Sequence, residues 1–261
     1  GATWLGQAYG WRTAYVLVAV IGVATVALIA YAVPHLPADP TRTVRSELSA
    51  LTSPQGWLTL GVGAVGSGGM FAMYSSIAPT VTDVTGLPAS AVPLFLLVFG
   101  VSGFIGNIVA GRMGDWSVIR SIVIGLVGMG VALGVFAAVA SYAVPALVVL
   151  ALTAVLASVL VINLQLRLMQ VAGSAQTLAA ASNHAALNLA NALGAWLGGL
   201  VIAAGYGYRA PSVVGVGLAV LGLAILGISL LIHRRDHPGR VSIRPGGPAG
   251  RDASSSVAQV S

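Results

Sequence analysis

The sequence predicts an all-helical protein that crosses a membrane several times. Of its 261 residues, 57% are hydrophobic and only 7% are charged, and the mean hydropathy is +0.94. A soluble domain carries about 25% charged residues, so a water-soluble core is not the expected class. The apolar residues form seven long runs. Each run is long enough to cross about 30 Å of hydrocarbon as a helix, and none shows the alternation of a barrel strand.

The seven predicted spans are separated by short polar connections. They are, in order, residues 13–33, 56–81, 91–110, 117–140, 146–166, 178–204 and 212–232. Trp4, Tyr9 and Trp11 precede the first span, where aromatic side chains suit the headgroup level. Residues 34–55 contain four prolines and predict a polar loop. From His233 onward the chain turns to Pro, Gly, Ser and Arg, which predicts a disordered tail.

The arginines between the spans predict the orientation of the chain. Two of them lie with Asp115 in one short connection, residues 111–120, and charges are costly inside hydrocarbon. If this connection is cytoplasmic, as the positive-inside rule favours, seven arginines lie inside and two lie outside, even without Arg240, Arg244 and Arg251 of the tail, which would also lie inside. The inner set is Arg42, Arg45, Arg112, Arg120, Arg167, Arg234 and Arg235, and the outer set is Arg12 and Arg209. Orientation thus accounts for the net charge of +6, and we expect a cytoplasmic carboxyl terminus and no nucleic-acid partner.

The connection at 111–120 is the first candidate functional site. Gly111 and Gly114 would allow a tight turn between two helices. Asp115 would then face the positive end of the following helix and could pair with Arg112 or Arg120. Such a pair could be a conformational latch that locks one state and breaks in the other. The alternative is an ordinary turn flanked by arginines.

A polar face marks the predicted sixth span. His184, Asn188 and Asn191 recur at i, i+4 and i+7, within about 60° of a helix surface. Gly194 and Gly198 adjoin this face and would permit close helix packing. Such a face either lines a water-filled cavity or makes hydrogen bonds between helices, and both interpretations remain open. His184 could carry a proton or remain a neutral hydrogen-bonding group.

Two aromatic residues follow a glycine-rich stretch in the second span. Phe71 and Tyr74 would suit an amphiphilic ligand in a substrate cavity, or they pack between helices. The sequence has no cysteine and four scattered histidines, so we expect no metal site. It also lacks a phosphate-binding loop, a nucleophile elbow and an embedded pair of carboxylates, so we expect no cofactor and no enzymatic activity.

Taken in order, these motifs resemble the drug:proton antiporters of the major facilitator superfamily. The Gly-Arg-x-x-Asp pattern that begins at Gly111 resembles the signature loop of that superfamily. The other similar segments are residues 5–12, 47–58, 99–112 and 188–199. The resemblance covers about residues 1–233, and subgroups that export arabinose-type sugars or chloramphenicol are the most similar. Trp116 departs from the pattern, since the family usually has a basic residue there.

The resemblance implies a partial twelve-helix transporter. Residues 1–33 would be the end of helix five and helix six of the first bundle, 34–55 the cytoplasmic central loop, 56–232 the second six-helix bundle, and 233–261 a disordered cytoplasmic tail. The implied function is proton-coupled efflux of a drug or sugar by alternating access in the bacterial inner membrane. The implied partners are the small-molecule substrate, protons, membrane lipid and a missing amino-terminal bundle. An uncoupled metabolite facilitator and a truncated remnant that does not transport remain alternatives.

Overall fold

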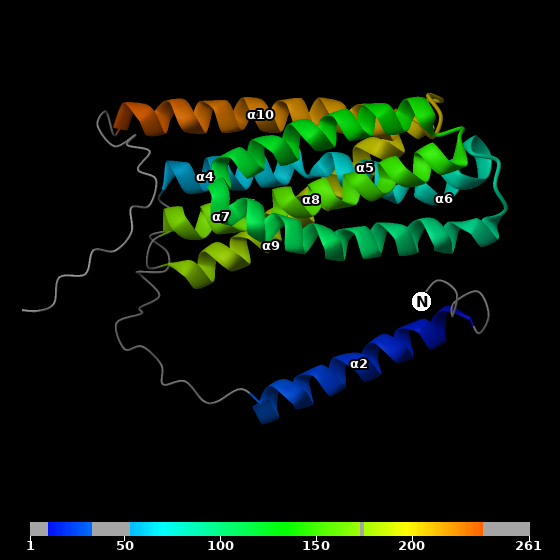
Figure 1. The fold of residues 1–261 in the computed structure, drawn as a ribbon, viewed down its shortest axis with the longest axis horizontal. Helices are drawn as coiled ribbons and strands as arrows, with labels where there is room; N and C mark the ends of the chain where they lie inside the picture. The colour runs from blue at the N-terminus through cyan, green and yellow to red at the C-terminus, as the bar shows by residue number, and fades with distance from the viewer. Residues whose placement is uncertain (1–9, 33–52, 173–174, 237–261) are drawn as a thin grey trace, which may run out of the picture.

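The computed structural model describes residues 10–32, 53–172 and 175–236, and every regular element in these ranges is a helix (Figure 1). The helices are α2 (Trp11–Ala32), α4 (Pro54–Gly61), η2 (Val62–Gly66), α5 (Gly68–Ser75), α6 (Ile77–Pro79), η3 (Thr80–Val84), η4 (Ala89–Ala91), α7 (Val92–Val139), α8 (Ala143–Ala172), α9 (Gln176–Ala203) and α10 (Ala210–Asp236). The predicted all-helical class is confirmed. The predicted end of helix five, most of the central loop and most of the tail lie outside the described residues.

The longest helix, α7, contains two passes of the bundle. Its 48 residues would extend about 72 Å as a straight helix, more than twice the thickness of the hydrocarbon. At Ser117 the backbone is extended, with φ −171° and ψ 113°, and the chain reverses there (Figure 1). The two limbs correspond to the predicted spans 91–110 and 117–140. We call the end of the bundle that carries Ser117 the reversal end.

The predicted span 56–81 is a broken helix rather than a continuous one. It comprises α4, η2, α5, α6 and η3, of which η2 and η3 are wide π-helical turns. Ser53 caps its start by accepting a hydrogen bond from the amide of Gly56 at 3.3 Å. Near its other end, Pro79 lacks the amide hydrogen that a continuous helix would use. The described residues thus form seven passes, one for each predicted span. They are α2, the broken segment, the two limbs of α7, α8, α9 and α10.

Glycines set the closest contacts within the bundle. A Cβ atom on Gly69 of α5 would lie 2.7 Å from the carbonyl oxygen of Gly215 in α10. One on Gly222 would lie 2.8 Å from the Cα of Gly66 in η2. The backbones of the broken segment and α10 are therefore in direct contact. Lipid provides no hydrophobic drive between helices, so such close packing contributes van der Waals energy that larger residues would prevent.

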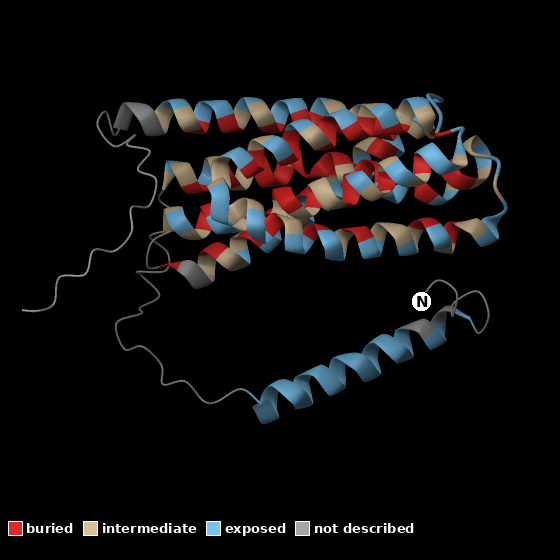
Figure 2. Ribbon diagram, in the orientation of Figure 1, coloured by how far each residue is buried: buried red, intermediate tan, exposed pale blue. Residues whose placement is uncertain are grey.

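Buried residues gather inside the bundle formed by the helices after residue 53, while α2 is exposed along its described length (Figure 2). The largest buried side chains of the bundle include Met129, Leu133 and Phe136 from the second limb of α7, and Leu150 and Leu160 from α8. The two limbs of α7 and α8 thus form one side of the bundle around a shared apolar core.

The end of α8 differs from the predicted boundary. The predicted span stops at Leu166 and places Arg167 in a polar connection, whereas α8 continues to Ala172. Arg167 therefore lies inside a helix, and only 6% of its surface is exposed. The boundary was wrong because a charged residue normally marks the end of a span, but this one is enclosed by neighbouring helices.

Candidate functional site

The reversal of α7 is organised by serines rather than by the glycines of the motif. Ser117 accepts a hydrogen bond from the amide of Arg120 at 3.4 Å, which caps the second limb. Ser121 donates to the carbonyl oxygen of Met113 at 2.7 Å and to that of Ser117 at 2.8 Å. These bonds tie the end of the first limb to the start of the second. The reversal thus occurs within the predicted connection 111–120.

Gly111 and Gly114 do not form the predicted tight turn, because both lie within the helical first limb of α7. A Cβ atom on Gly114 would lie 2.9 Å from Oδ1 of Asn163 in α8, so this glycine allows α7 and α8 to approach closely. A Cβ atom on Gly111 would meet nothing within 4 Å. The two glycines of the motif therefore have different structural roles.

The charged residues of the predicted latch are exposed. Asp115 forms no ion pair with Arg112 or Arg120 among the described residues. The guanidinium carbon of Arg120 instead lies 5.1 Å from the centroid of the Trp116 ring, within the range of a cation–π interaction. Asp115 also precedes the capping Ser117, so it belongs to the end of the first limb rather than to the start of the second. The latch stays a prediction.

The polar face of α9 is brought to the surface of the bundle. His184, Asn188 and Asn191 are all exposed. A second exposed sector of α9 is apolar and includes Leu189 and Trp196. Leu189 lies about 140° around the helix from His184, so the polar and apolar sectors are distinct. The exposed surface of α9 therefore has a polar part and an apolar part, which suit different surroundings.

The predicted packing glycines lie where α9 meets α5. A Cβ atom on Gly194 would lie 2.2 Å from the carbonyl oxygen of Gly68 and 3.0 Å from the Cβ of Phe71. A Cβ atom on Gly198 would lie 3.2 Å from the carbonyl oxygen of Ala72. Phe71 is thus placed against α9, one helical turn from Asn191.

Tyr74 faces the first limb of α7 rather than α9. Its ring centroid lies 4.8 Å from that of Phe99, and the planes are inclined by 39°, a geometry typical of aromatic pairs. Tyr74 is also partly exposed. The cavity candidates therefore fall into two groups. The structure brings Phe71 next to the α9 face and pairs Tyr74 with Phe99, a residue that the sequence analysis did not select as a cavity candidate.

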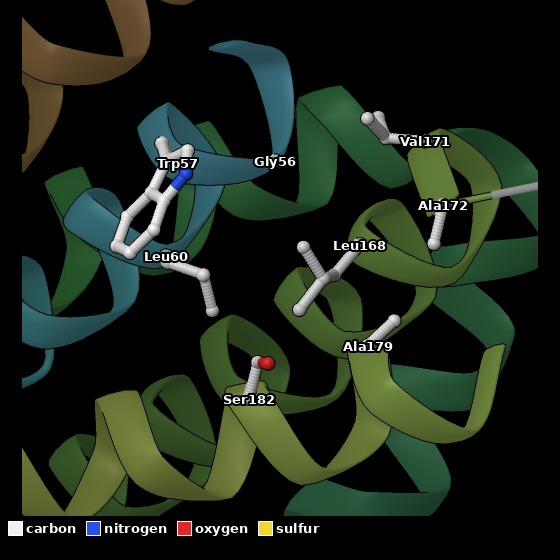
Figure 3. A pocket seen from close by; sticks show the side chains of 8 residues that line it. All are labelled: Gly56, Trp57, Leu60, Leu168, Val171, Ala172, Ala179 and Ser182. Atoms are coloured by element: carbon white, nitrogen blue, oxygen red, sulfur yellow. The ribbon is translucent and has the colours of Figure 1, made fainter. Parts of the chain in front are cut away.

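A groove between α4 and α9 was not predicted from the sequence. Its volume is about 350 Å³, and a small neighbouring hollow of about 10 Å³ shares Trp57, Leu60 and Ser182 with it. Figure 3 shows the side chains of Trp57 and Leu60 from α4, Leu168 from α8 and Ser182 from α9 around this hollow. The remaining residues of the groove are Gly61, Ala64, Ala185, Ala186 and Leu189. Small and apolar residues carry no chemical signal in a sequence, which is why the groove was missed.

Sequence reasoning also missed a buried hydrogen-bond network at the reversal end. Arg167 donates through Nη2 to Oγ of Ser229 at 3.0 Å. Ser229 donates to Oε1 of Gln55 at 2.7 Å, and Nε2 of Gln55 donates to the carbonyl oxygen of Ser229 at 3.0 Å. The network joins α8, α10 and α4. Gln55 and Ser229 are 174 residues apart, so no local pattern could reveal it.

Comparison with known proteins assigns these features to a family. The model of the Major Facilitator Superfamily matches residues 1–180 and residues 60–258. The inner membrane transport protein YdhP of Escherichia coli (strain K12) is 34% identical over 223 residues, which cover 84% of this chain and 57% of YdhP. The putative transporter AraJ of the same organism is 27% identical over 208 residues, covering 79% of this chain and 53% of AraJ.

A third relative is the chloramphenicol resistance protein of Streptomyces lividans, which is 34% identical over 119 residues, covering 44% of this chain and 30% of that protein. The chain thus spans a little over half the length of YdhP and AraJ. With its all-helical bundle and apolar passes, the chain is a multi-pass membrane protein and belongs to the Major Facilitator Superfamily.

Proposed function

We propose that the chain forms part of a transporter that exports a small molecule, a drug or a sugar, in exchange for protons. The observation that carries the proposal is the family match together with relatives that are named as transport proteins, one of them a chloramphenicol resistance protein. Alternating access would be achieved by rocking this bundle against a first bundle around a midplane site. We place the protein in the bacterial inner membrane with its carboxyl terminus in the cytoplasm.

The exposed face of α9 and the aromatic pair on α5 and α7 support one wall of the transport pathway. His184, Asn188 and Asn191 would offer hydrogen-bonding groups to a substrate, and Phe71 and Tyr74 would offer aromatic surface. Polar side chains in membrane helices are costly when they face lipid, so an exposed polar sector favours a water-filled pathway. The opposite wall would be formed by the first bundle, and the unpaired Asp115 would act in the latch during the conformational cycle.

The position of the acids bears on proton coupling. The structure describes the side chains of two acidic residues, Asp83 and Asp115, and both are exposed. Asp83 lies in the final turn of the broken segment, and Asp115 lies at the reversal. We propose that a proton-carrying carboxylate is contributed by the first bundle. The same observation favours the second candidate function, an uncoupled metabolite facilitator, since a facilitator needs no such group.

The test is transport by the full-length protein in proteoliposomes with an imposed pH gradient, using chloramphenicol and L-arabinose as probes. The proposal predicts substrate movement that follows the gradient and stops when a proton ionophore collapses it. Movement that persists with the ionophore would favour the facilitator. Correct insertion with no movement of either probe, or of any compound in a wider panel, would favour a remnant that does not transport.

A further inference from the structure

Arg167 is a buried cation near the end of a membrane-spanning helix. It lies five residues before the end of α8, and 6% of its surface is exposed. A guanidinium group always carries charge and has five N–H donors, so burial requires acceptors to replace water. In membrane proteins such a residue normally pairs with an opposite charge or with backbone carbonyl groups. Within the described ranges, no carboxylate forms an ion pair with Arg167.

The one acceptor that the described residues provide to Arg167 comes from another helix and is neutral. Ser229 of α10, which is fully buried, accepts from Nη2 at 3.0 Å. Nε of Arg167 is buried and has no hydrogen-bond partner among the residues that the structure describes. Because its proton goes to Gln55, the hydroxyl of Ser229 presents its lone pairs to the guanidinium. Gln55 thereby sets the direction of the Ser229 hydroxyl.

Gln55 is held at both ends of its amide. Its Oε1 accepts from the hydroxyl of Ser229, and its Nε2 donates to the backbone carbonyl of the same residue. This double contact fixes the first turn of α4 against α10. The wide turn η2 begins at Val62, less than two helical turns further on. The network thus holds the broken segment immediately before the first place where its helical pattern changes.

We propose that Arg167, Ser229 and Gln55 form a clamp that makes the reversal ends of α4, α8 and α10 move as one body. Any bending of the broken segment is then confined to η2 and the residues beyond it. Arg167 is the positioning residue of the clamp. Since the acceptor of Arg167 is neutral and the buried Nε has no partner among the described residues, the clamp specifies the arrangement of the helices more than it stabilises the fold. Buried polar groups have this role in some proteins.

The first test is a double-mutant cycle in the full-length protein, read as the apparent Tm in detergent. Ser229→Ala leaves the guanidinium without its acceptor and should lower the Tm by about 5 °C. Arg167→Met should cost less, because an apolar side chain needs no acceptor. In the Arg167→Met background, Ser229→Ala removes only the hydrogen bond to Gln55 and should lower the Tm by about 2 °C, less than half of its effect beside Arg167. Equal losses in the two backgrounds would overturn the clamp.

A matched control is provided by Ser158 of α8, which donates to the carbonyl oxygen of Gly103 at 3.1 Å. Ser158→Ala also removes a bond between helices but lies outside the clamp. Ser158→Ala should change the Tm by the same amount in the Arg167 background and in the Arg167→Met background. A background dependence as large as that of Ser229→Ala would show general weakening of α8 and would contradict the proposal.

The second test measures position rather than stability. Spin labels on Gln170 and Leu231, both exposed, report the distance between the reversal ends of α8 and α10. Labels on Val144 and Val213, also exposed, report the opposite ends of the same helices. The chain has no cysteine, so each label is attached to a cysteine introduced at the chosen position. Any cysteines elsewhere in the full-length protein are replaced first.

Arg167→Met should at least double the width of the distance distribution at the reversal end and leave that at the opposite end unchanged. Arg167→Lys, which cannot reproduce the geometry of the guanidinium, should give an intermediate width. If Arg167→Met does not accumulate in the membrane, Ser229→Ala carries the same test. An unchanged width at the reversal end, or equal broadening at both ends, would overturn the proposal.

Discussion

Gly194→Ala tests whether α9 and α5 are held together by direct backbone contact. The added Cβ would lie 2.2 Å from the carbonyl oxygen of Gly68 and 2.9 Å from the amide nitrogen of Ala72. Ordinary van der Waals contact begins at 3.4 Å, so the helices would have to separate by about 1 Å. Both obstructing atoms belong to the backbone, and no change of side-chain rotamer can relieve the clash.

The expected loss lies at the upper end of the range for overpacking, about 3 kcal/mol. For a bundle of this size it corresponds to a fall of about 6–12 °C in the apparent Tm. The same helix offers graded controls. A Cβ on Gly198 would lie 3.2 Å from its nearest neighbour, and one on Gly199 would meet nothing within 4 Å. Gly199→Ala should be neutral or slightly stabilising, because alanine favours helix over glycine by about 1 kcal/mol.

The assay is thermal unfolding of the full-length protein in detergent, followed by fluorescence-detected size-exclusion chromatography after heating. The three variants should rank with Gly194→Ala least stable, Gly198→Ala intermediate and Gly199→Ala most stable. If Gly194→Ala and Gly199→Ala differ by less than about 2 °C, the packing of α9 on α5 does not depend on this contact and the reasoning fails.

Three further predictions concern the motif and the polar face. Asp115→Asn should leave the apparent Tm unchanged, because Asp115 forms no ion pair with any residue that the structure describes. It should nevertheless slow transport if the latch acts in another conformation; unaltered turnover would leave no support for the latch. Gly114→Ala should lower the apparent Tm, since its Cβ would crowd α8, whereas Gly111→Ala should not; equal losses would contradict this division of roles. Asn188→Cys should react with a membrane-impermeant thiol reagent, while the fully buried Ala190→Cys should resist it; protection of both would favour interhelical packing over a wet pathway.

The number of the passes and the place of the reversal illustrate what local sequence can determine. Hydrocarbon requires about 20 apolar residues in a row and leaves backbone groups no partner except their own helix. Each of the helices α8, α9 and α10 is long and apolar enough to meet these requirements by itself, so their passes could be predicted without knowing their neighbours. The reversal near Ser117 was predictable for the same reason, because Arg112, Asp115 and Arg120 interrupt the apolar pattern.

The sequence by itself determined the class of the fold, the passes and the polar face of α9, because each depends on residue type and spacing along one helix. Only the tertiary structure decided that Gly114 serves packing rather than a turn, that Arg167 is buried, and that Trp57 and Ser182 share a hollow. These features depend on which helices meet, and the contacting residues lie far apart in the chain. Distances between helices are set by the summed packing of many small side chains, so no single motif can encode them.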